Sequence, residues 1–379
     1  MQTISQTSAI LRYIMSKEIK KRTTIKDIAT ALNIHNSTVS RALQDHPDIN
    51  PETKEKVLNM AKEMHYFPNA VAQRLKTNKT FTIGVVVPDL SKPFFAQIIH
   101  SIIEVAAKNK YQTIITVSLE NPDLERENIK TLISERVDGM LVCTTMDTVD
   151  LDIFDLVEEE GIPLVFFDRV PNIDTFSSAA INHHSSVYSA IDFIIKQGYK
   201  QIAFLAGSSR IPMGKERIQG YKDAMESNGF DVKEELIIQG CNSKKDGLKA
   251  LKRMYKNSEL PELIFTTNSI VAQGVYEAAG ELKINIPEEL GIVGFGPDKE
   301  LANLLIPKLT YLRTFPNKIG KSAIKLLLKE IKSAKSAGAL HQYIPVKLVI
   351  NESCRILNDM SHKSSNKPRI MGDTIISKE

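Results

Sequence analysis

The stretch TIKDIATALNIHNSTVSRAL, residues 24–43, decides the fold of the first part of this chain. The apolar residues of its first half recur at helical spacing, at Ile25, Ile28, Ala29 and Leu32. Asn33 follows them, and asparagine tolerates the left-handed backbone conformation that a tight turn requires. A second short helix is predicted from about residue 36 to residue 43, with Val39, Ala42 and Leu43 on its inward face.

The opposite face of this second helix is polar. It carries Asn36, Ser37, Ser40 and Arg41. Two short helices joined by a tight turn, the second with such a face, are typical of a helix-turn-helix. The face can enter a major groove because no side chain on it is bulky or acidic. The pattern alone fits a small helical hairpin with a solvated face equally well.

The next residues decide between these two interpretations. Asn50 and Pro51 predict the start of a third helix, as a capping residue followed by proline at the first helical position. From residue 24 to residue 75 the chain then resembles the DNA-binding head of the LacI/GalR family of bacterial repressors. The matching segments are residues 24–29 (TIKDIA), 37–41 (STVSR), 68–69 (PN) and 72–75 (AQRL).

The resemblance implies an operator-binding head over residues 24–67 and a hinge helix and linker over residues 68–80. One departure is His35, where the family usually has a serine that caps the recognition helix. Either Asn36 caps the helix instead, or the helix starts less sharply. The hinge is expected to fold only on DNA, with Leu75 wedged between base steps in the minor groove. The DNA contacts implied are Thr24, Asn36, Ser37, Thr38, Arg41, Tyr66, Asn69, Ala72 and Leu75.

Charge and cysteine usage agree with this interpretation. The net charge is +4, and residues 20–79 hold eleven Lys and Arg against six Asp and Glu. A basic head fits a polyanionic partner such as DNA.

The three cysteines do not predict a disulfide framework or a metal site. Residues 1–23 are read as an N-terminal extension without the features of a signal peptide, and no apolar run reaches the length of a membrane span, so we expect a cytoplasmic protein without a membrane partner.

From residue 81 the pattern changes to alternating apolar strands and amphipathic helices. This alternation predicts an α/β fold with parallel sheets covered on both faces. It resembles the two-subdomain periplasmic-binding-protein-like core of the same family, which follows a small all-α helix-turn-helix head. The core is expected over residues 81–357, with three chain crossings between subdomains, and residues 358–379 are expected to be disordered. The expected subdomains are about residues 81–180 plus 312–340, and residues 181–311 plus 341–357.

Polar and aromatic residues at predicted strand exits match the effector pocket of this family. The effector-binding residues implied are Phe94, Phe95, Asp168, Arg169, Arg217, Asn268 and Asp298. For Phe95 an ordinary core position is an equal alternative, and Arg169 fits an ion pair with Asp168 or with an interface carboxylate equally well. The family often has Gly-Phe-Asp-Asp near residues 294–298, where this chain has GFGPD, so Asp298 either replaces the lost acid or is a loop residue.

These features predict a homodimeric transcription regulator, a repressor that reads a near-palindromic double-stranded operator and responds to a small polar effector. A carbohydrate is expected, because sugars are the commonest effectors of the family. The alternative is a sugar-binding protein that has kept a vestigial head and does not bind DNA. An enzyme is not expected, and neither is a cofactor, because phosphate loops, nucleophile elbows and metal-binding histidine clusters are missing from the sequence. The adjacent His183 and His184 are interpreted as a solvated loop.

Overall fold

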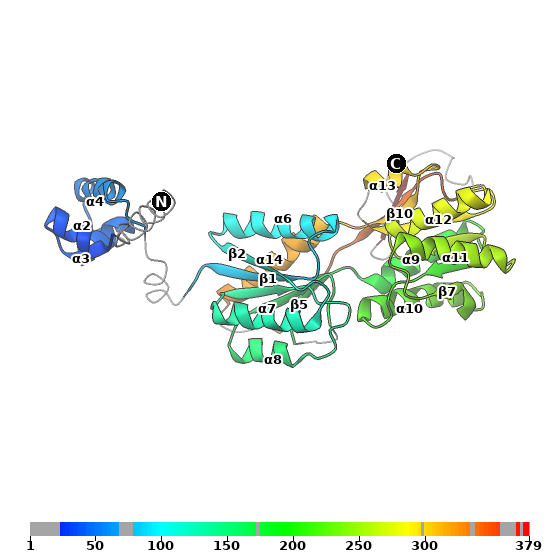
Figure 1. The fold of residues 1–379 in the computed structure, drawn as a ribbon, viewed down its shortest axis with the longest axis horizontal. Helices are drawn as coiled ribbons and strands as arrows, with labels where there is room; N and C mark the ends of the chain where they lie inside the picture. The colour runs from blue at the N-terminus through cyan, green and yellow to red at the C-terminus, as the bar shows by residue number, and fades with distance from the viewer. Residues whose placement is uncertain are drawn as a thin grey trace, which may run out of the picture. The chain divides into compact units, whose positions relative to one another are not determined.

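The computed structural model describes residues 23–67, 79–171, 175–296, 299–333, 338–356, 369–371 and 374–378. The chain forms two compact units, Met1–Lys79 and Thr80–Glu379. The first contains the predicted head and the second the predicted core, and many elements of both are labelled in Figure 1.

Three short helices build the head: α2 (Ile25–Leu32), α3 (Asn36–Leu43) and α4 (Pro51–Glu63). Each helix begins where its sequence supplies a cap. Thr24 forms a capping box with Asp27 at the start of α2, and the side chain of Asn50 accepts a hydrogen bond from the Thr53 N–H at 2.7 Å. Asn33 ends α2 in the left-handed conformation, with φ 50°, as the turn requires.

The inward faces of the three helices meet in one small core. Its fully buried members are Ile28, Ala29, Val39, Ala42, Val57 and Ala61. Leu58 on α4 is apolar but does not belong to this core, since it is 54% exposed. Met60, one helical turn from Val57, packs against the core instead.

In the second unit, a six-stranded sheet forms the first subdomain, and all of its paired strands run parallel. The order is β11-β5-β4-β3-β1-β2, with α7 and α8 on one face and α6 and α14 on the other. The strands are β1 (Thr82–Val87), β2 (Gln112–Val117), β3 (Gly139–Val142), β4 (Leu164–Phe167), β5 (Ser177–Ala180) and β11 (His341–Tyr343). The helices are α6 (Pro93–Lys108), α7 (Pro122–Ser134), α8 (Asp152–Glu159) and α14 (Pro316–Lys332).

An eight-stranded sheet, of order β13-β14-β12-β10-β9-β8-β6-β7, forms the second subdomain. It is not wholly parallel as predicted, because β10 pairs antiparallel with β12 and β13 antiparallel with β14. The strands are β6 (Ile202–Leu205), β7 (Ile237–Ile238), β8 (Leu263–Thr266), β9 (Gly291–Gly296), β10 (Thr310–Arg313), β12 (Val346–Ile350), β13 (Arg369–Met371) and β14 (Thr374–Lys378). The helices are α9 (His183–Lys196), α10 (Pro212–Ser227), α11 (Lys244–Lys256), α12 (Ser269–Leu282), α13 (Lys299–Leu304) and the short 3₁₀ helix η1 (Glu234–Leu236).

The chain crosses between the two sheets three times: after β5, after β10 and after β11. Two of the predicted boundaries are displaced by a few residues. Residues 312–313 still belong to β10 of the second sheet, and residues 341–343 form β11 at the edge of the first. In both places the strand is short and continues the sheet before the chain turns away, which an apolar pattern does not reveal.

The C-terminal tail is not disordered throughout, so that expectation is wrong for residues 369–371 and 374–378. Strand β14 pairs in parallel with β12 in the register Val346 with Thr374 through Ile350 with Lys378. Thr374 is fully buried. The segment TIISK is rich in β-branched residues, and it covers the edge that β12 would otherwise expose.

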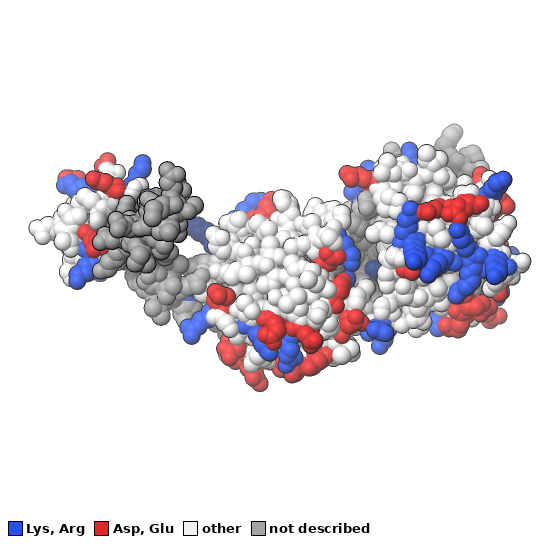
Figure 2. All heavy atoms as spheres, viewed as in Figure 1, with Lys and Arg blue, Asp and Glu red and all other residues white. Residues whose placement is uncertain are grey.

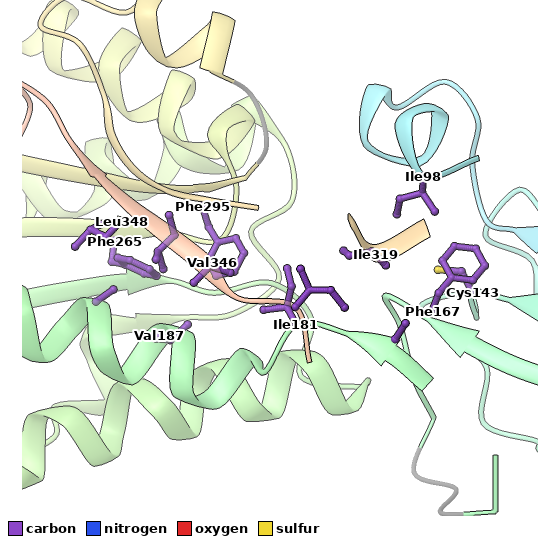
Figure 3. Close-up of a cluster of buried hydrophobic side chains, with 14 of the residues drawn as sticks. Ile98, Cys143, Phe167, Ile181, Val187, Phe265, Phe295, Ile319, Val346 and Leu348 are labelled. Carbon is purple, nitrogen blue, oxygen red and sulfur yellow. The ribbon is translucent and has the colours of Figure 1, made fainter. Parts of the chain in front are cut away.

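A continuous set of buried apolar side chains extends through both subdomains of the core (Figure 3). Ile98, Cys143, Phe167 and Ile319 belong to the first subdomain. Phe265, Phe295, Val346 and Leu348 belong to the second, and Ile181 lies on the crossing between them. The two sheets are therefore joined by apolar packing as well as by three chain segments.

The charged side chains of the core gather in mixed patches. Figure 2 shows Lys and Arg side chains on one face at the position of α11, together with Asp and Glu. Lys244 pairs there with Glu277 at 2.5 Å, and Lys252 pairs with Glu281. Exposed pairs of this kind contribute about 0–1 kcal/mol each. Within the described residues, no helix is both long and apolar enough to span a bilayer.

Gly220 allows α10 to approach α9 closely. A Cβ atom built on Gly220 would lie 2.4 Å from the carbonyl oxygen of His184. We expect Gly220→Ala to lower the free energy of unfolding by about 1–3 kcal/mol, because the two helices must separate. Gly280→Ala in α12 is the matched control, since a Cβ there has no atom within 4 Å. Denaturant titration should show a stable control variant, and equal stability of both variants would contradict this packing.

Candidate DNA-binding and ligand-binding sites

The predicted recognition helix is α3, and its cap differs from the one that Asn36 would provide. The N-cap is His35, whose Nδ1 accepts a hydrogen bond from the Ser37 N–H at 3.3 Å. Asn36 is the first residue inside the helix. Histidine thus takes the capping position that serine holds in the family pattern, and the helix starts at the same residue as predicted.

The polar face of α3 is free to meet a partner. Asn36, Ser37 and Arg41 are exposed, and Thr38 is half-buried. A hollow of about 470 Å³ lies beside the turn between α2 and α3. It is lined by Lys26, Ala29, Thr30, Asn33, Ile34, His35 and Asn36.

Other predicted DNA contacts have different surroundings. Thr24 is exposed, and its hydroxyl donates to Asp27 at 2.7 Å. Tyr66 is half-buried and packs against the core of the head. The hinge residues Asn69, Ala72 and Leu75 lie outside the described residues, and the same is true of Asp298 in the core.

At the junction of the two subdomains, Asp168 follows β4 and is 7% exposed. Its backbone has φ 60°, an uncommon conformation for a residue with a side chain. Burial raises the pKa of the Asp168 carboxyl, and the charges of Arg169 and Arg217 only partly oppose this effect. Among the described residues, its carboxylate has no hydrogen-bond partner.

The side chain of Arg169 is engaged within its own subdomain. It donates from Nη1 and Nη2 to the two carboxylate oxygens of Glu120, at 2.8 and 2.9 Å, and from Nη1 to the Thr144 carbonyl oxygen at 3.2 Å. Its guanidinium carbon lies 5.5 Å from the centre of the Phe95 ring. Burial raises the pKa of Glu120, but the hydrogen bonds and charge of Arg169 lower it below its usual value overall. This ion pair fixes the β4 exit and leaves Arg169 with little capacity for a ligand.

Arg217 comes from α10 in the second subdomain. Its Nε donates to His183 Nδ1 at 3.2 Å, and its Nη1 donates to Thr267 Oγ1 at 3.1 Å. The guanidinium carbon lies 4.2 Å from the centre of the Phe295 ring. Burial lowers the pKa of Arg217 to about 10, so the group stays charged at neutral pH. Within the described part of the chain it forms no ion pair, although it interacts with the charge of Asp168.

His183 is a candidate site residue that the sequence analysis missed. Both His183 and His184 lie in the first turn of α9, not in a solvated loop, and His183 is 3% exposed. Burial, together with the charge of Arg217, lowers the pKa of His183 well below its usual value. Because Nδ1 accepts from Arg217, the neutral ring carries its proton on Nε2, and this buried N–H has no hydrogen-bond partner among the described residues. Two features of the sequence could have indicated that a helix starts at His183, namely the capping residue Asn182 and the strand that precedes it.

The remaining residues predicted to contact a ligand differ in how accessible their side chains are. Phe95 is 3% exposed and belongs to the core, whereas Phe94 is half-buried and packs edge-on against it with ring centres 5.3 Å apart. Asn268 caps α12 by accepting from the Val271 N–H at 2.8 Å, which leaves its amide NH₂ available. Gly296 occupies the position of the lost acid, with φ 149°. In the described residues no group of three His, Cys, Asp or Glu side chains could hold a metal ion.

The buried Asp168 carboxylate should reduce the stability of the ligand-free protein at neutral pH. A carboxyl whose pKa is raised by folding favours the folded state below its unfolded pKa, and that contribution is lost as the pH rises through the folded pKa. Asp168→Asn should therefore raise the melting temperature at pH 7, and the gain should shrink as the pH falls toward about 4.

Asp138→Asn is the matched control for this prediction. The Asp138 carboxylate accepts hydrogen bonds from the N–H groups of Thr80 and Phe81 at 2.7 and 3.0 Å. Its replacement should lower the melting temperature, because one carboxylate oxygen is lost as an acceptor. A lower melting temperature for Asp168→Asn at pH 7 would show that the protein itself satisfies this carboxylate.

Comparisons with known proteins agree with the head and the core. Residues 24–69 match the family model described as bacterial regulatory proteins, lacI family. Residues 80–352 match the model of periplasmic binding proteins and sugar binding domain of LacI family. The resemblance noted in the sequence and the α/β fold class are thereby confirmed.

Curated relatives cover nearly the same length. Catabolite control protein A of Priestia megaterium is 30% identical over 307 residues, which is 81% of this chain and 92% of that protein. The HTH-type transcriptional repressor PurR of Haemophilus influenzae (strain PittEE) is 30% identical over 341 residues, covering 88% and 98%. These relatives are regulators and not enzymes.

A solved structure of the Lac repressor dimer bound to operator and the anti-inducer ONPF has the same fold, with a TM-score of 0.78 at 22% identity over 88% of this chain and 99% of that one. The complex of the transcriptional regulator CelR with cellobiose gives a TM-score of 0.65 at 22% identity, over 88% and 100%. On the evidence of the two family models and of relatives at this identity and coverage, the chain belongs to the LacI family of bacterial regulatory proteins.

Proposed function

We propose that this chain is a homodimeric repressor that reads a near-palindromic operator through α3 and whose operator affinity is set by a small polar ligand, a carbohydrate or a derivative of one. The observation that carries the proposal is the intact recognition helix. Its start is capped, its inward face is buried, and its outward face presents Asn36, Ser37 and Arg41 to solvent. The N-terminal part of such a helix contacts base edges in the major groove.

The alternative of a vestigial head is not favoured. A head that no longer bound DNA would not need its caps and its core preserved, yet Thr24, His35 and Asn50 each cap a helix. Six side chains close the core beneath them.

The proposed ligand site is the junction between β4, α9, α10 and β8. Asp168 offers an acceptor from the first subdomain, while Arg217 and His183 offer donors from the second. A ligand that carries both hydroxyl donors and acceptors, as a sugar does, matches this set. Binding would link the subdomains and thereby favour one orientation of them.

Dimerisation is proposed because a near-palindromic operator needs two heads related by two-fold symmetry. The core exposes large apolar side chains that such an interface would cover. Ile103 on α6 is 40% exposed, Ile270 on α12 is 48% exposed, and Ile306 is 90% exposed. In Figure 2 the part of the surface around α6 shows few charged side chains.

The first experiment tests base reading. Arg41→Ala should cost about 1–3 kcal/mol of discrimination between the preferred operator and a single-base variant, because a bidentate contact to guanine is lost. Lys56→Ala is the control, since Lys56 on α4 is exposed and pairs with Glu52. Binding is measured on duplexes enriched from a random library by the wild-type protein. Unchanged affinity and selectivity of Arg41→Ala would remove this arginine from the interface.

The second experiment tests the ligand site. Sugars and nucleobases are screened for a rise in melting temperature, and the most effective compound is used to measure operator affinity with and without it. A coupling of 1–3 kcal/mol corresponds to a change of roughly 5–150-fold in affinity. Arg217→Ala should abolish this change, and Arg253→Ala should retain it, because Arg253 is exposed on α11 of the second subdomain.

The direction of control follows from the same measurement. If the compound is an inducer, Arg217→Ala binds the operator under all conditions, and if it is a co-repressor, the variant binds under none. A variant that responds at the wild-type concentration places the ligand elsewhere.

A further inference from the structure

The capping residue of α3 also fixes the hydroxyl of Ser37, which lies on the proposed DNA-binding face. His35 Nδ1 lies 3.3 Å from the backbone nitrogen of Ser37 and 2.8 Å from its hydroxyl oxygen. A backbone N–H can only donate, so Nδ1 in this contact is an unprotonated acceptor. The proton of the neutral imidazole is then on Nε2.

The same argument sets the direction of the second contact. An unprotonated Nδ1 cannot donate to the Ser37 hydroxyl, so the hydroxyl donates to Nδ1. In the described part of the head, residues 23–67, the Ser37 hydroxyl has no other hydrogen-bond partner. With its hydrogen directed at His35, this oxygen presents only lone pairs to solvent.

An ordinary serine reads a base edge as either a donor or an acceptor, because its hydroxyl rotates. Ser37 is the second residue of α3 and is exposed, at the end of the recognition helix that meets base edges. In the major groove, adenine offers the N6 amino group and cytosine the N4 amino group, whereas guanine and thymine present acceptors to a side chain there. A serine hydroxyl that only accepts hydrogen bonds therefore distinguishes adenine and cytosine from guanine and thymine.

We propose that His35 is a positioning residue that holds Ser37 as a hydrogen-bond acceptor, so that the base contacted by Ser37 is adenine or cytosine. The inference rests on the proposed function, in which α3 enters the major groove of an operator. It assigns a role in specificity to the capping residue, which itself needs no contact with a base.

The test uses the full-length protein and a library of random duplexes, from which bound sequences are recovered and read. Three variants are compared with the wild type. Ser37→Ala identifies the position that Ser37 reads. His35→Ser keeps an N-cap, since serine is a strong capping residue, but removes the imidazole acceptor. His46→Ala is the control, because His46 Nδ1 also accepts a backbone N–H, from Asp48 at 3.3 Å, but lies outside α3.

The wild type and His46→Ala should prefer adenine or cytosine at one position of each half-site. Ser37→Ala and His35→Ser should both lose that preference, by roughly two- to tenfold, which is the effect of one net hydrogen bond. Preferences at the other positions should persist in His35→Ser, and the double variant should lose no more than either single variant. A helix that had only lost its cap would weaken binding to all sequences alike.

Two results would overturn this inference alone: a His35→Ser variant that keeps the wild-type preference, or a wild type that prefers guanine or thymine at the position read by Ser37. A wild type that enriches no sequence would overturn the proposed function as well. Circular dichroism and melting of His35→Ser confirm that the head is folded in each comparison.

Discussion

The core of this protein depends on one electrostatic constraint. A buried carboxylate in the first subdomain and a half-buried guanidinium in the second interact electrostatically but do not form an ion pair. Asp168 follows β4 and Arg217 lies on α10, and the charge of each shifts the pKa of the other. Burying charged groups without a paired counter-charge is unfavourable. The apolar packing that extends through both sheets, together with three chain crossings, holds them there.

His183 adds a third group of this kind. Its Nε2–H is buried without a partner in the described structure, while its Nδ1 orients Arg217. By contrast, the neighbouring Arg169 and Glu120 form two hydrogen bonds with one another. One buried cation is paired and the next polar group is left without a partner, which supports the proposal that a ligand binds here, since buried unsatisfied polar groups are rare.

The head was largely predictable because its signals are local. Caps, an asparagine in the turn and apolar residues at helical spacing are all encoded within a few residues, and α3 begins and ends where the pattern predicts. The strands next to the crossings were harder, because β5 and β11 are short and are stabilised by neighbours far away in the sequence. Tail strand β14 and the burial of His183 also depend on tertiary contacts, and no local pattern reports them.

Thermodynamic linkage tests the central claim most directly, namely that this LacI-family chain couples a ligand site in its core to operator binding by its head. Operator affinity is measured with and without the compound that stabilises the protein most, and the affinity for that compound is measured with and without operator. The two ratios must be equal and different from one, because coupling between two sites is reciprocal. Ratios of one in both directions, with both partners bound, would contradict the account.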